Sequence, residues 1–249
     1  MRDVPGRVVC GLQAVREAIR AHGAALQRVM IEGAAPGASP QLEALARFAR
    51  DHGAAVDRPA RGELDRVARG VRHQGAVAIA PPLSIRSLDE VPIGPDALVV
   101  ALDELQDPQN FGAVIRSSVA MGATAVVWPE HASAPLSPST FRASAGAVEL
   151  ATLCRVASLP AALDALRARG AACVGLEMGG ATRIDRVDLA RGVVLVVGAE
   201  GKGLRRSVKR SCDALAHVPM PGPIASLNAS AAVAIALYEA VRQRSAASG

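Results

Sequence analysis

The 249-residue sequence predicts an α/β protein with a small domain over residues 1–80 and a larger domain over residues 97–249. Three observations support this fold class. Because 50% of the residues are hydrophobic and 20% are charged, the chain can bury a core and is neither disordered nor a coiled coil. After residue 97, apolar runs of strand length alternate with helical patterns, which is typical of a mostly parallel sheet covered on both faces. Between the domains, the proline-rich residues 81–96 resist helix and central strand and form a linker.

In the first domain, apolar residues at helical spacing predict helices through residues 12–19 and 42–48. A β-branched patch at 29–31 and alternating apolar residues at 77–79 predict strands. Up to residue 83 the chain holds 12 arginines against eight acidic residues, a net charge of +4, whereas the remainder carries +1. The first domain is therefore the better candidate for contact with a polyanion.

The second domain is predicted to contain five strands and four helices. The strands are expected over residues 97–102, 125–128, 171–176, 193–197 and 214–218, and the helices over 111–121, 159–169 behind Ser158 as a cap, 204–211 and 227–242. Residues 214–238 carry no formal charge and are long enough to cross a bilayer, but their three prolines predict a strand, a loop and a buried helix instead. Parallel sheets bind ligands in the loops beyond the carboxyl ends of their strands, so these loops are the candidate site.

Other features narrow the function classes. The four cysteines form no C-x-x-C pair and the five histidines are scattered, which predicts reduced thiols and no metal site. No apolar stretch of signal-peptide length follows Met1–Pro5, which favours a cytoplasmic location. Only five residues are aromatic, which argues against modules that stack bases on aromatic platforms.

Three of the loops carry candidate chemistry. In the first, an acidic turn after residue 102 leads to a helix that is expected to open at Asn110 as its N-cap, with Arg116 farther along. In the second, three glycines within residues 198–203 let the backbone approach a ligand, although the pattern matches neither G-x-G-x-x-G nor a P-loop. In the third, prolines stiffen residues 218–225 before Ser226, a candidate cap of the last helix, and before Asn228. Each loop alone is equally compatible with a capped helix or a simple turn.

Five cations follow the glycine-rich loop, and five arginines are concentrated in the first domain. The cations are Lys202, Arg205, Arg206, Lys209 and Arg210, and the arginines are Arg58, Arg61, Arg66, Arg69 and Arg72. Both groups fit phosphate contacts with RNA, and both also fit an ordinary solvated surface.

Together the three loops resemble a known set of motifs. They read Asn110-x-Gly112-x-x-x-Arg116, Gly198-Ala199-Glu200-Gly201 and Pro219-Met220-x-Gly222-x-x-x-Ser226-Leu227-Asn228, as in the SpoU class (SPOUT superfamily) of S-adenosylmethionine-dependent RNA 2′-O-ribose methyltransferases. The segments Gly11–Val15 and His73–Gly75 resemble the N-terminal domain of the RlmB subfamily, which methylates a guanosine of 23S rRNA. The resemblance covers the whole chain. Because the tRNA enzymes of the TrmH type lack such an N-terminal domain, its presence favours rRNA as the substrate.

The resemblance implies a fold, a cofactor and partners. The larger domain is expected to be a trefoil-knot methyltransferase domain, and the smaller one an RNA-binding domain similar to a ribosomal protein. The implied cofactor is S-adenosylmethionine, and the implied partners are RNA and a second copy of the chain in a homodimer. DNA is not expected as a partner, because the acceptor 2′-hydroxyl exists only in RNA. A membrane is not expected either, since the uncharged residues 214–238 are interrupted by prolines.

The resemblance also assigns site residues. The implied catalytic residues are Arg116, Asn110, Glu200, Ser226 and Asn228, and the implied cofactor-binding residues are Gly198, Val218, Leu227, Leu176 and Glu200. A guanidinium is always protonated, so Arg116 is a poor general base. We therefore expect Arg116 to clamp an RNA phosphate and place the hydroxyl, while the proton leaves through phosphate or water.

Three other interpretations stay open at this level. One is a tRNA methylase or an antibiotic-resistance-type rRNA methylase, which shares the chemistry. Another is a non-enzymatic RNA-binding or ribosome-assembly factor, which the presence of Asn110, Arg116, Glu200 and Asn228 disfavours. The last is a generic nucleotide-binding enzyme, which the missing phosphate-binding fingerprints disfavour.

Overall fold

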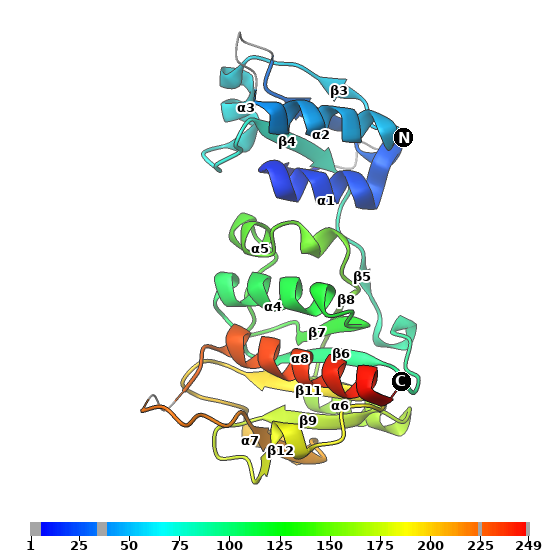
Figure 1. Ribbon diagram of the computed structural model, residues 1–249, viewed down its shortest axis with the longest axis vertical. Coiled ribbons are helices and arrows are strands. Elements are labelled where there is room, and N and C mark those ends of the chain that lie inside the picture. Colours follow the sequence, from blue (N-terminus) through cyan, green and yellow to red (C-terminus); the bar gives the residue numbers. More distant parts are fainter. Residues whose placement is uncertain (1–5, 34–38, 224–225, 248–249) are drawn as a thin grey trace. The chain divides into compact units, whose positions relative to one another are not determined.

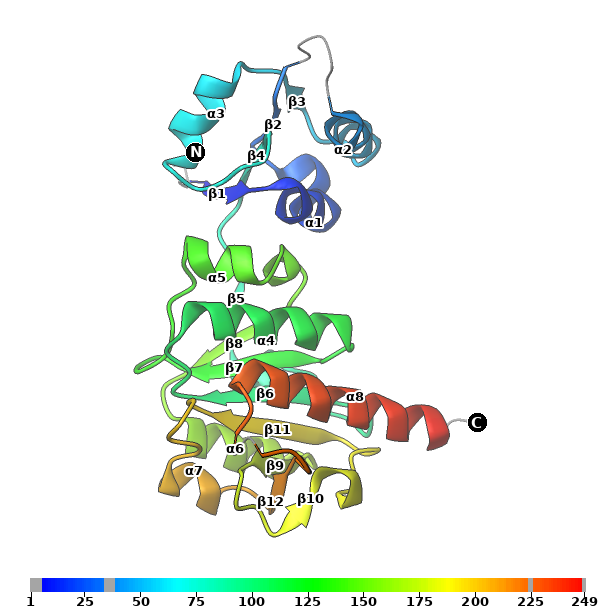
Figure 2. The ribbon, with the colours of Figure 1, turned by 60° about the vertical axis from the view of Figure 1, so that its left-hand side comes forward.

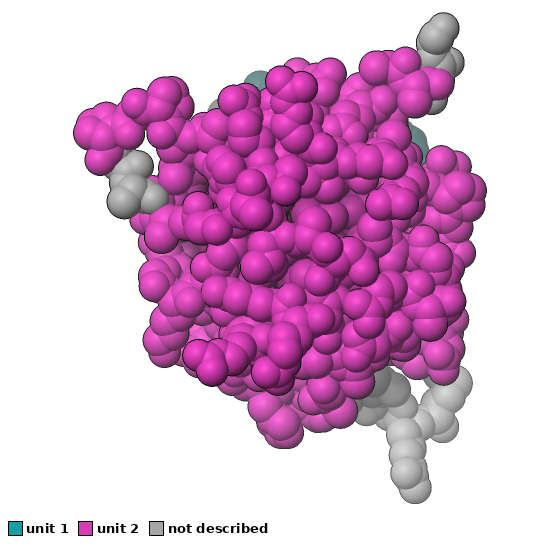
Figure 3. Space-filling view, turned by 90° about the horizontal axis from the view of Figure 1, so that it is seen from below, with its two compact units in different colours: residues 1–84, 136–150 teal, residues 85–135, 151–249 magenta. Residues whose placement is uncertain are grey.

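The computed structural model describes residues 6–33, 39–223 and 226–247. The N-terminal stretch Met1–Pro5, on which the expected location depends, lies outside these residues. The chain divides into two compact units, coloured separately in Figure 3. Unit 1 comprises residues 1–84 together with 136–150, and unit 2 comprises residues 85–135 together with 151–249.

Unit 1 contains a four-stranded sheet in the order β1-β4-β2-β3. Strands β1 (Arg7–Cys10), β4 (Ala76–Ala80) and β2 (Arg28–Ile31) pair antiparallel, and β3 (Val56–Asp57) pairs parallel to β2. Its helices are α1 (Leu12–His22), α2 (Pro40–Asp51) and α3 (Arg61–Ala68), with a 3₁₀ turn at Gly23–Ala25. The two predicted helices and two predicted strands are confirmed, whereas β1, β3 and α3 are additional.

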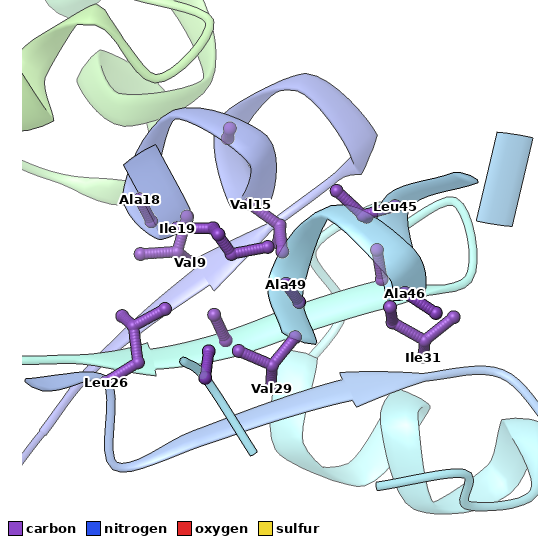
Figure 4. Close-up of a cluster of buried hydrophobic side chains, with 14 of the residues drawn as sticks. Val9, Val15, Ala18, Ile19, Leu26, Val29, Ile31, Leu45, Ala46 and Ala49 are labelled. Atoms are coloured by element: carbon purple, nitrogen blue, oxygen red, sulfur yellow. The ribbon is translucent and has the colours of Figure 1, made fainter. Parts of the chain in front are cut away.

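Side-chain alternation along the strands gives this sheet two apolar faces. On one face, Val29 and Ile31 of β2 pack with α1 and α2, for example with Val15 and Leu45 (Figure 4). On the other face, Met30 of β2 packs with Leu64 of α3 and with Val77. The sheet is therefore buried on both sides.

Residues 136–150 add two short helical segments to unit 1, α5 (Pro138–Ala143) and a 3₁₀ turn at Ala147–Glu149. The buried Glu149 carboxylate accepts two hydrogen bonds from the Arg7 guanidinium, at 2.7 and 2.6 Å, and contacts His22 Nε2 at 3.0 Å. The Arg7 guanidinium also lies over the Phe141 ring, 5.1 Å from its centroid. An ion pair between residues 142 positions apart thus holds this segment on the unit.

Unit 2 contains an eight-stranded sheet in the order β10-β12-β9-β11-β6-β7-β8-β5, in which every pair is parallel. The strands are β5 (Ile85–Arg86), β6 (Leu98–Asp103), β7 (Ala125–Pro129), β8 (Leu153–Val156), β9 (Ala172–Leu176), β10 (Thr182–Arg183), β11 (Val193–Gly198) and β12 (Ala214–His217). The five predicted strands and the predicted parallel sheet are confirmed. Every residue of β6 and β11 is buried, as expected for central strands covered on both faces.

Helices cover both faces of this sheet. On one face, α4 (Pro108–Ala120) and α8 (Ala229–Ala247) lie side by side, and α6 (Leu159–Ala168) and α7 (Arg206–Arg210) cover the other (Figure 1, Figure 2). Short 3₁₀ turns occur at Leu88–Glu90 and Ile184–Arg186. Ser158 caps α6 as predicted, its side chain accepting from Ala161 N.

Two predicted caps are wrong by a few residues. Helix α4 begins at Pro108 and not at Asn110, because Asp107 is the N-cap and accepts from the backbone N–H of Asn110 at 2.9 Å. An aspartate followed by proline is a stronger start signal than an asparagine three residues later. At the start of α8, Asn228 and not Ser226 caps the helix, since its Oδ1 accepts from Ser230 N at 2.9 Å.

The last part of the chain crosses the sheet. Strand β12 lies beyond β9, whereas α8 packs on α4 and β11. The chain after β12 therefore returns to the other side of the sheet, and its residues Val218, Met220, Ser226 and Leu227 line a pocket at the carboxyl ends of the strands. Residues 214–238 contain a strand, a loop and a helix, as predicted, and within the described residues no helix has the length and apolarity to span a membrane. The knotted path that the resemblance implies stays a prediction.

Candidate functional site

A pocket of about 390 Å³ opens at the carboxyl ends of β9, β11 and β12. The loops after these three strands line it, together with the start of α8. All five residues expected to bind the cofactor lie in its wall, namely Gly198, Val218, Leu227, Leu176 and Glu200, and so does Ser226. The loops after β9, β11 and β12, which are separate in the sequence, thus form one pocket at the place where parallel sheets bind ligands.

Strand β11 requires glycine at its last residue, Gly198, because of the loop that follows. Gly203 N donates to Ala199 O at 2.9 Å, which folds residues 199–203 back on themselves. A Cβ atom on Gly198 would lie 2.1 Å from Gly203 O, closer than any side chain tolerates. Gly201 and Gly203 have positive φ angles of 75° and 65°, which favour glycine. The backbone itself therefore forms this wall of the pocket.

Glu177, which the sequence analysis did not single out, lines the pocket and anchors the same loop. Its Oε2 accepts from Leu204 N at 3.2 Å and lies 3.1 Å from Lys209 Nζ. The signal available in the sequence was an acidic residue directly after the buried strand β9. Met178 and Met220 also line the pocket without having been predicted.

A buried carboxylate fixes the far end of this loop. Asp103, the last residue of β6, has a fully buried side chain that accepts from Arg205 N at 2.8 Å and from Arg205 Nε at 2.7 Å. Arg205 and Lys209 are therefore engaged in ion pairs that position the loop. Of the five clustered cations, Lys202, Arg206 and Arg210 remain exposed, without an ion-pair partner among the described residues.

Three of the expected catalytic residues form a hydrogen-bond network at the pocket rim. Asn228 Nδ2 donates to Asn110 Oδ1 at 2.8 Å, and Asn110 Nδ2 donates to Glu200 Oε2 at 3.3 Å. Asn228 Oδ1 accepts from both the N–H and the hydroxyl of Ser230, at 2.9 and 2.6 Å. The network joins the start of α4, the loop after β11 and the start of α8.

Arg116 is placed differently from the other expected catalytic residues. It lies on α4 with an exposed side chain, outside the residues that line the pocket. Within the described ranges it has no hydrogen-bond or ion-pair partner. Glu200 and Ser226 therefore line the pocket, and Asn110 and Asn228 do not line it but are joined to Glu200 by hydrogen bonds. Arg116 is left free to contact another molecule.

In the described part of the chain, no group of three or more His, Cys, Asp or Glu side chains is arranged to hold a metal ion. Apolar side chains, backbone groups and a few charged side chains, among them Glu177, Glu200 and Lys202, line the pocket. Such a surface suits an organic ligand with an apolar ring and a few polar groups.

Two family models match the chain. Residues 97–238 match the SpoU rRNA Methylase family, and residues 8–85 match the family described as RNA 2′-O ribose methyltransferase substrate binding. A protein of Mycolicibacterium vanbaalenii named as an uncharacterized tRNA/rRNA methyltransferase is 38% identical over 245 residues, covering 96% of this chain and 77% of that protein. A Mycobacterium tuberculosis protein with the same name is 40% identical over 206 residues, covering 81% of this chain and 64% of that protein.

Solved structures agree with this match. The SpoU methyltransferase AviRb from Streptomyces viridochromogenes has a TM-score of 0.79 at 28% identity, covering 98% of this chain and 91% of that chain. AviRb has also been solved with its cofactor AdoMet. An AdoMet-bound rRNA methyltransferase from Sinorhizobium meliloti has a TM-score of 0.76 at 27% identity, covering 96% of this chain and 87% of that chain. With more than half of its length matched by the family model, the chain belongs to the SpoU family of RNA methyltransferases.

Proposed function

We propose that the protein transfers the methyl group of S-adenosylmethionine to a ribose 2′-oxygen of RNA, and that its target is a guanosine of 23S rRNA, as in the RlmB subfamily. The observation that carries the proposal is the pocket at the ends of β9, β11 and β12, with Asn110, Asn228 and Glu200 joined at its rim. The match of residues 8–85 to a substrate-binding domain of 2′-O-ribose methyltransferases supports the ribose as acceptor.

The pocket fits S-adenosylmethionine in size and lining. Leu176, Val218 and Leu227 give it apolar walls suited to an adenine ring, and the backbone of residues 198–203 supplies polar groups. The Glu200 carboxylate lies in the wall, where a negative charge favours a sulfonium cation. When bound, S-adenosylmethionine supplies an electrophilic methyl group.

The residues around the pocket have orienting roles in this proposal. The amides of Asn110 and Asn228 hold Glu200 in place, and Ser226 adds a hydroxyl at the same rim. Arg116 contacts the RNA phosphate beside the target and places the 2′-hydroxyl, whose proton leaves through phosphate or water. Its exposed position without a protein partner is what such a phosphate contact requires.

We also propose that the enzyme is a homodimer and that it works in the cytoplasm. Helix α8 exposes Ile235 and Tyr238, which are 40% and 60% accessible. Exposed apolar side chains on one helix fit an interface between copies of the chain. Because α8 packs on α4, a second copy on this face would lie near the helix that carries Arg116.

A tRNA substrate is the second candidate, because the relatives carry the name tRNA/rRNA methyltransferase. A structure described by its role in 2-OH methylation of C/U34 on tRNA is 32% identical, with a TM-score of 0.56. It covers only 61% of this chain, however, whereas the rRNA methyltransferase from Sinorhizobium meliloti covers 96%. The additional N-terminal unit therefore supports rRNA over tRNA.

The test is methyl transfer from labelled S-adenosylmethionine to unmodified 23S rRNA and to bulk tRNA, followed by nuclease mapping, with Arg116→Ala as the control. We expect 2′-O-methylguanosine in 23S rRNA only, lost in the variant. Label in tRNA would establish the second candidate. Tight RNA binding without label on either RNA would contradict the enzymatic proposal.

A further inference from the structure

Unit 1 contains a second pocket, of about 620 Å³, that the proposed methyl transfer does not use. It is lined by the first turns of α2, by α3 and by the loop between α3 and β4. Leu42 and Val71 give it apolar walls, Arg61 and Arg72 contribute positive charge, and the carboxylates of Glu32 and Asp65 also line it. Since every lining residue belongs to unit 1, the pocket is complete within that unit.

The loop between α3 and β4 has an unusual backbone. Four of its residues have positive φ angles, namely Arg69 at 48°, Gly70 at 82°, Gln74 at 53° and Gly75 at 80°. Two of these are not glycine, and such conformations persist only where the surrounding structure enforces them. They are concentrated at ligand-binding and catalytic sites in proteins.

His73, which is 4% exposed, provides that enforcement. Its Nδ1 accepts from Gly75 N at 3.0 Å, so the ring proton lies on Nε2, which donates to Asp65 Oδ1 at 2.9 Å. Gln74 Oε1 accepts from Leu12 N at 3.4 Å, and Gly75 O accepts from Glu32 N at 2.8 Å. The loop is thus fixed by α3, by α1 and by Glu32 just after β2 before any ligand binds, which lowers the entropic cost of binding.

The arginines at and near the pocket differ in whether they form ion pairs within the unit. Arg72 is exposed and has no ion-pair partner among the described residues. The Arg61 guanidinium is 66% accessible and reaches Glu32 only at 3.5 Å. By contrast, Arg58 makes a bidentate contact with Glu43, at 2.8 and 2.7 Å, and is engaged within the unit. The Arg72 guanidinium is therefore available to a ligand, whereas that of Arg58 is not.

We propose that this pocket receives one unpaired nucleotide of the RNA substrate, with its base against Leu42 and Val71 and its phosphate at Arg72. Apolar walls beside the unpaired Arg72 guanidinium are complementary to a nucleotide. The two carboxylates of the pocket are already engaged, Asp65 by His73 and Glu32 by Arg61. Bases stacked in a duplex cannot enter a cavity, so the nucleotide must be extruded from a loop, bulge or single strand. The inference rests on the proposed function, to which it adds the form of RNA that the N-terminal unit recognises.

The experiment measures binding of the full chain to an unmodified 23S rRNA transcript by filter binding at several salt concentrations. Arg72→Glu is compared with Arg66→Glu, because both arginines are exposed on the same unit and only Arg72 lines the pocket. We expect Arg72→Glu to raise the Kd at least tenfold and Arg66→Glu to raise it less than threefold. On a fully duplex RNA competitor the two variants should be equal. Arg72→Gln replaces Arg72→Glu if thermal unfolding shows that the latter does not fold.

Two results would overturn the inference. Equal effects of the Arg72 and Arg66 variants on 23S rRNA would mean that only net charge matters. Micromolar binding of GMP that depends on Arg72, with unchanged RNA binding, would mean that the pocket is a site for a free nucleotide. Methyl transfer by the unmodified protein is measured in a separate assay. If the Arg72 variant alone loses RNA binding but the unmodified protein transfers no methyl group, the proposed function is wrong and the nucleotide pocket is retained.

Discussion

Asn110 and Asn228 are 118 positions apart in the sequence, yet Asn228 Nδ2 donates a hydrogen bond of 2.8 Å to Asn110 Oδ1. The orientation of both amides follows from their neighbours. Because the backbone N–H of Ser230 can only donate, Asn228 must turn its oxygen toward it and its NH₂ toward Asn110. Asn110 must then accept with its oxygen and donate its NH₂ to the Glu200 carboxylate. The network therefore has one satisfied arrangement.

Asn228→Asp should break this arrangement. An ionised aspartate cannot donate to Asn110, and if the Asn110 amide rotates to compensate, its oxygen faces the Glu200 carboxylate. We expect methyl transfer to RNA to fall at least tenfold in kcat/KM, which corresponds to about 1.4 kcal/mol. Ser230→Ala, which leaves both asparagine amides in place, is the control and should change the rate less than threefold. An unchanged rate in Asn228→Asp would show that the network has no role in the reaction.

Gly198→Ala should damage the cofactor pocket. The new Cβ would lie 2.1 Å from Gly203 O, so the loop over residues 199–203 must move away from β11. We expect the affinity for S-adenosylmethionine, measured by calorimetry, to fall at least tenfold, or about 1.4 kcal/mol. Gly179→Ala is the matched control, because a Cβ there has no atom within 4 Å. Equal affinities of the two variants would argue against this loop as the cofactor wall.

Arg116→Lys tests the proposed phosphate clamp. Lysine keeps the charge but cannot make the bidentate contact of a guanidinium, so we expect kcat to fall at least tenfold, and further in Arg116→Ala. The melting temperature should stay within about 1 °C, because the exposed Arg116 side chain has no partner in the described structure. A lysine variant with a near-normal rate would show that charge alone suffices.

Arg205→Met should destabilise unit 2. Among the described residues, it leaves the fully buried Asp103 carboxylate with only the backbone N–H of residue 205 as a donor. Removing one partner of a buried ion pair costs several kcal/mol, and because Arg205 is 40% accessible we expect a loss of about 2 kcal/mol in the free energy of unfolding. Urea unfolding measures it, with the neighbouring Arg206→Met as a control that should stay within about 0.5 kcal/mol.

The cysteines should be inert in the folded protein. Burial disfavours the thiolate, which raises the pKa of Cys173 and Cys212 to about 12 and that of Cys10 and Cys154 to about 11. At pH 8 all four thiols are therefore protonated, and their reactive fraction increases only as the pH approaches these values. We expect thiol labelling at pH 8 to be slow in the native protein and fast in urea. Fast labelling of any cysteine without denaturant would contradict its burial.

The sequence by itself determined the α/β class, the parallel sheet and the loops of the site. Its long apolar strands, such as Val193–Gly198, are recognisable because central parallel strands are apolar at every position. The two-residue strands β5 and β10 were not predicted, since two residues show no periodicity. The loop motifs supplied Gly198, Glu200, Ser226 and Leu227 of the pocket, because these loops differ in composition from the strands around them.

Only the tertiary structure decided which of these residues meet. The order of strands in the sheet depends on long-range packing, and it is this order that places β9, β11 and β12 next to one another and forms the pocket. Glu177 and the Asn110–Asn228 bond owe their roles to that adjacency, which no local pattern encodes. The same holds for Glu149 in unit 1, since local sequence describes short-range structure, whereas a buried ion pair with Arg7 requires two segments 142 positions apart to fold together.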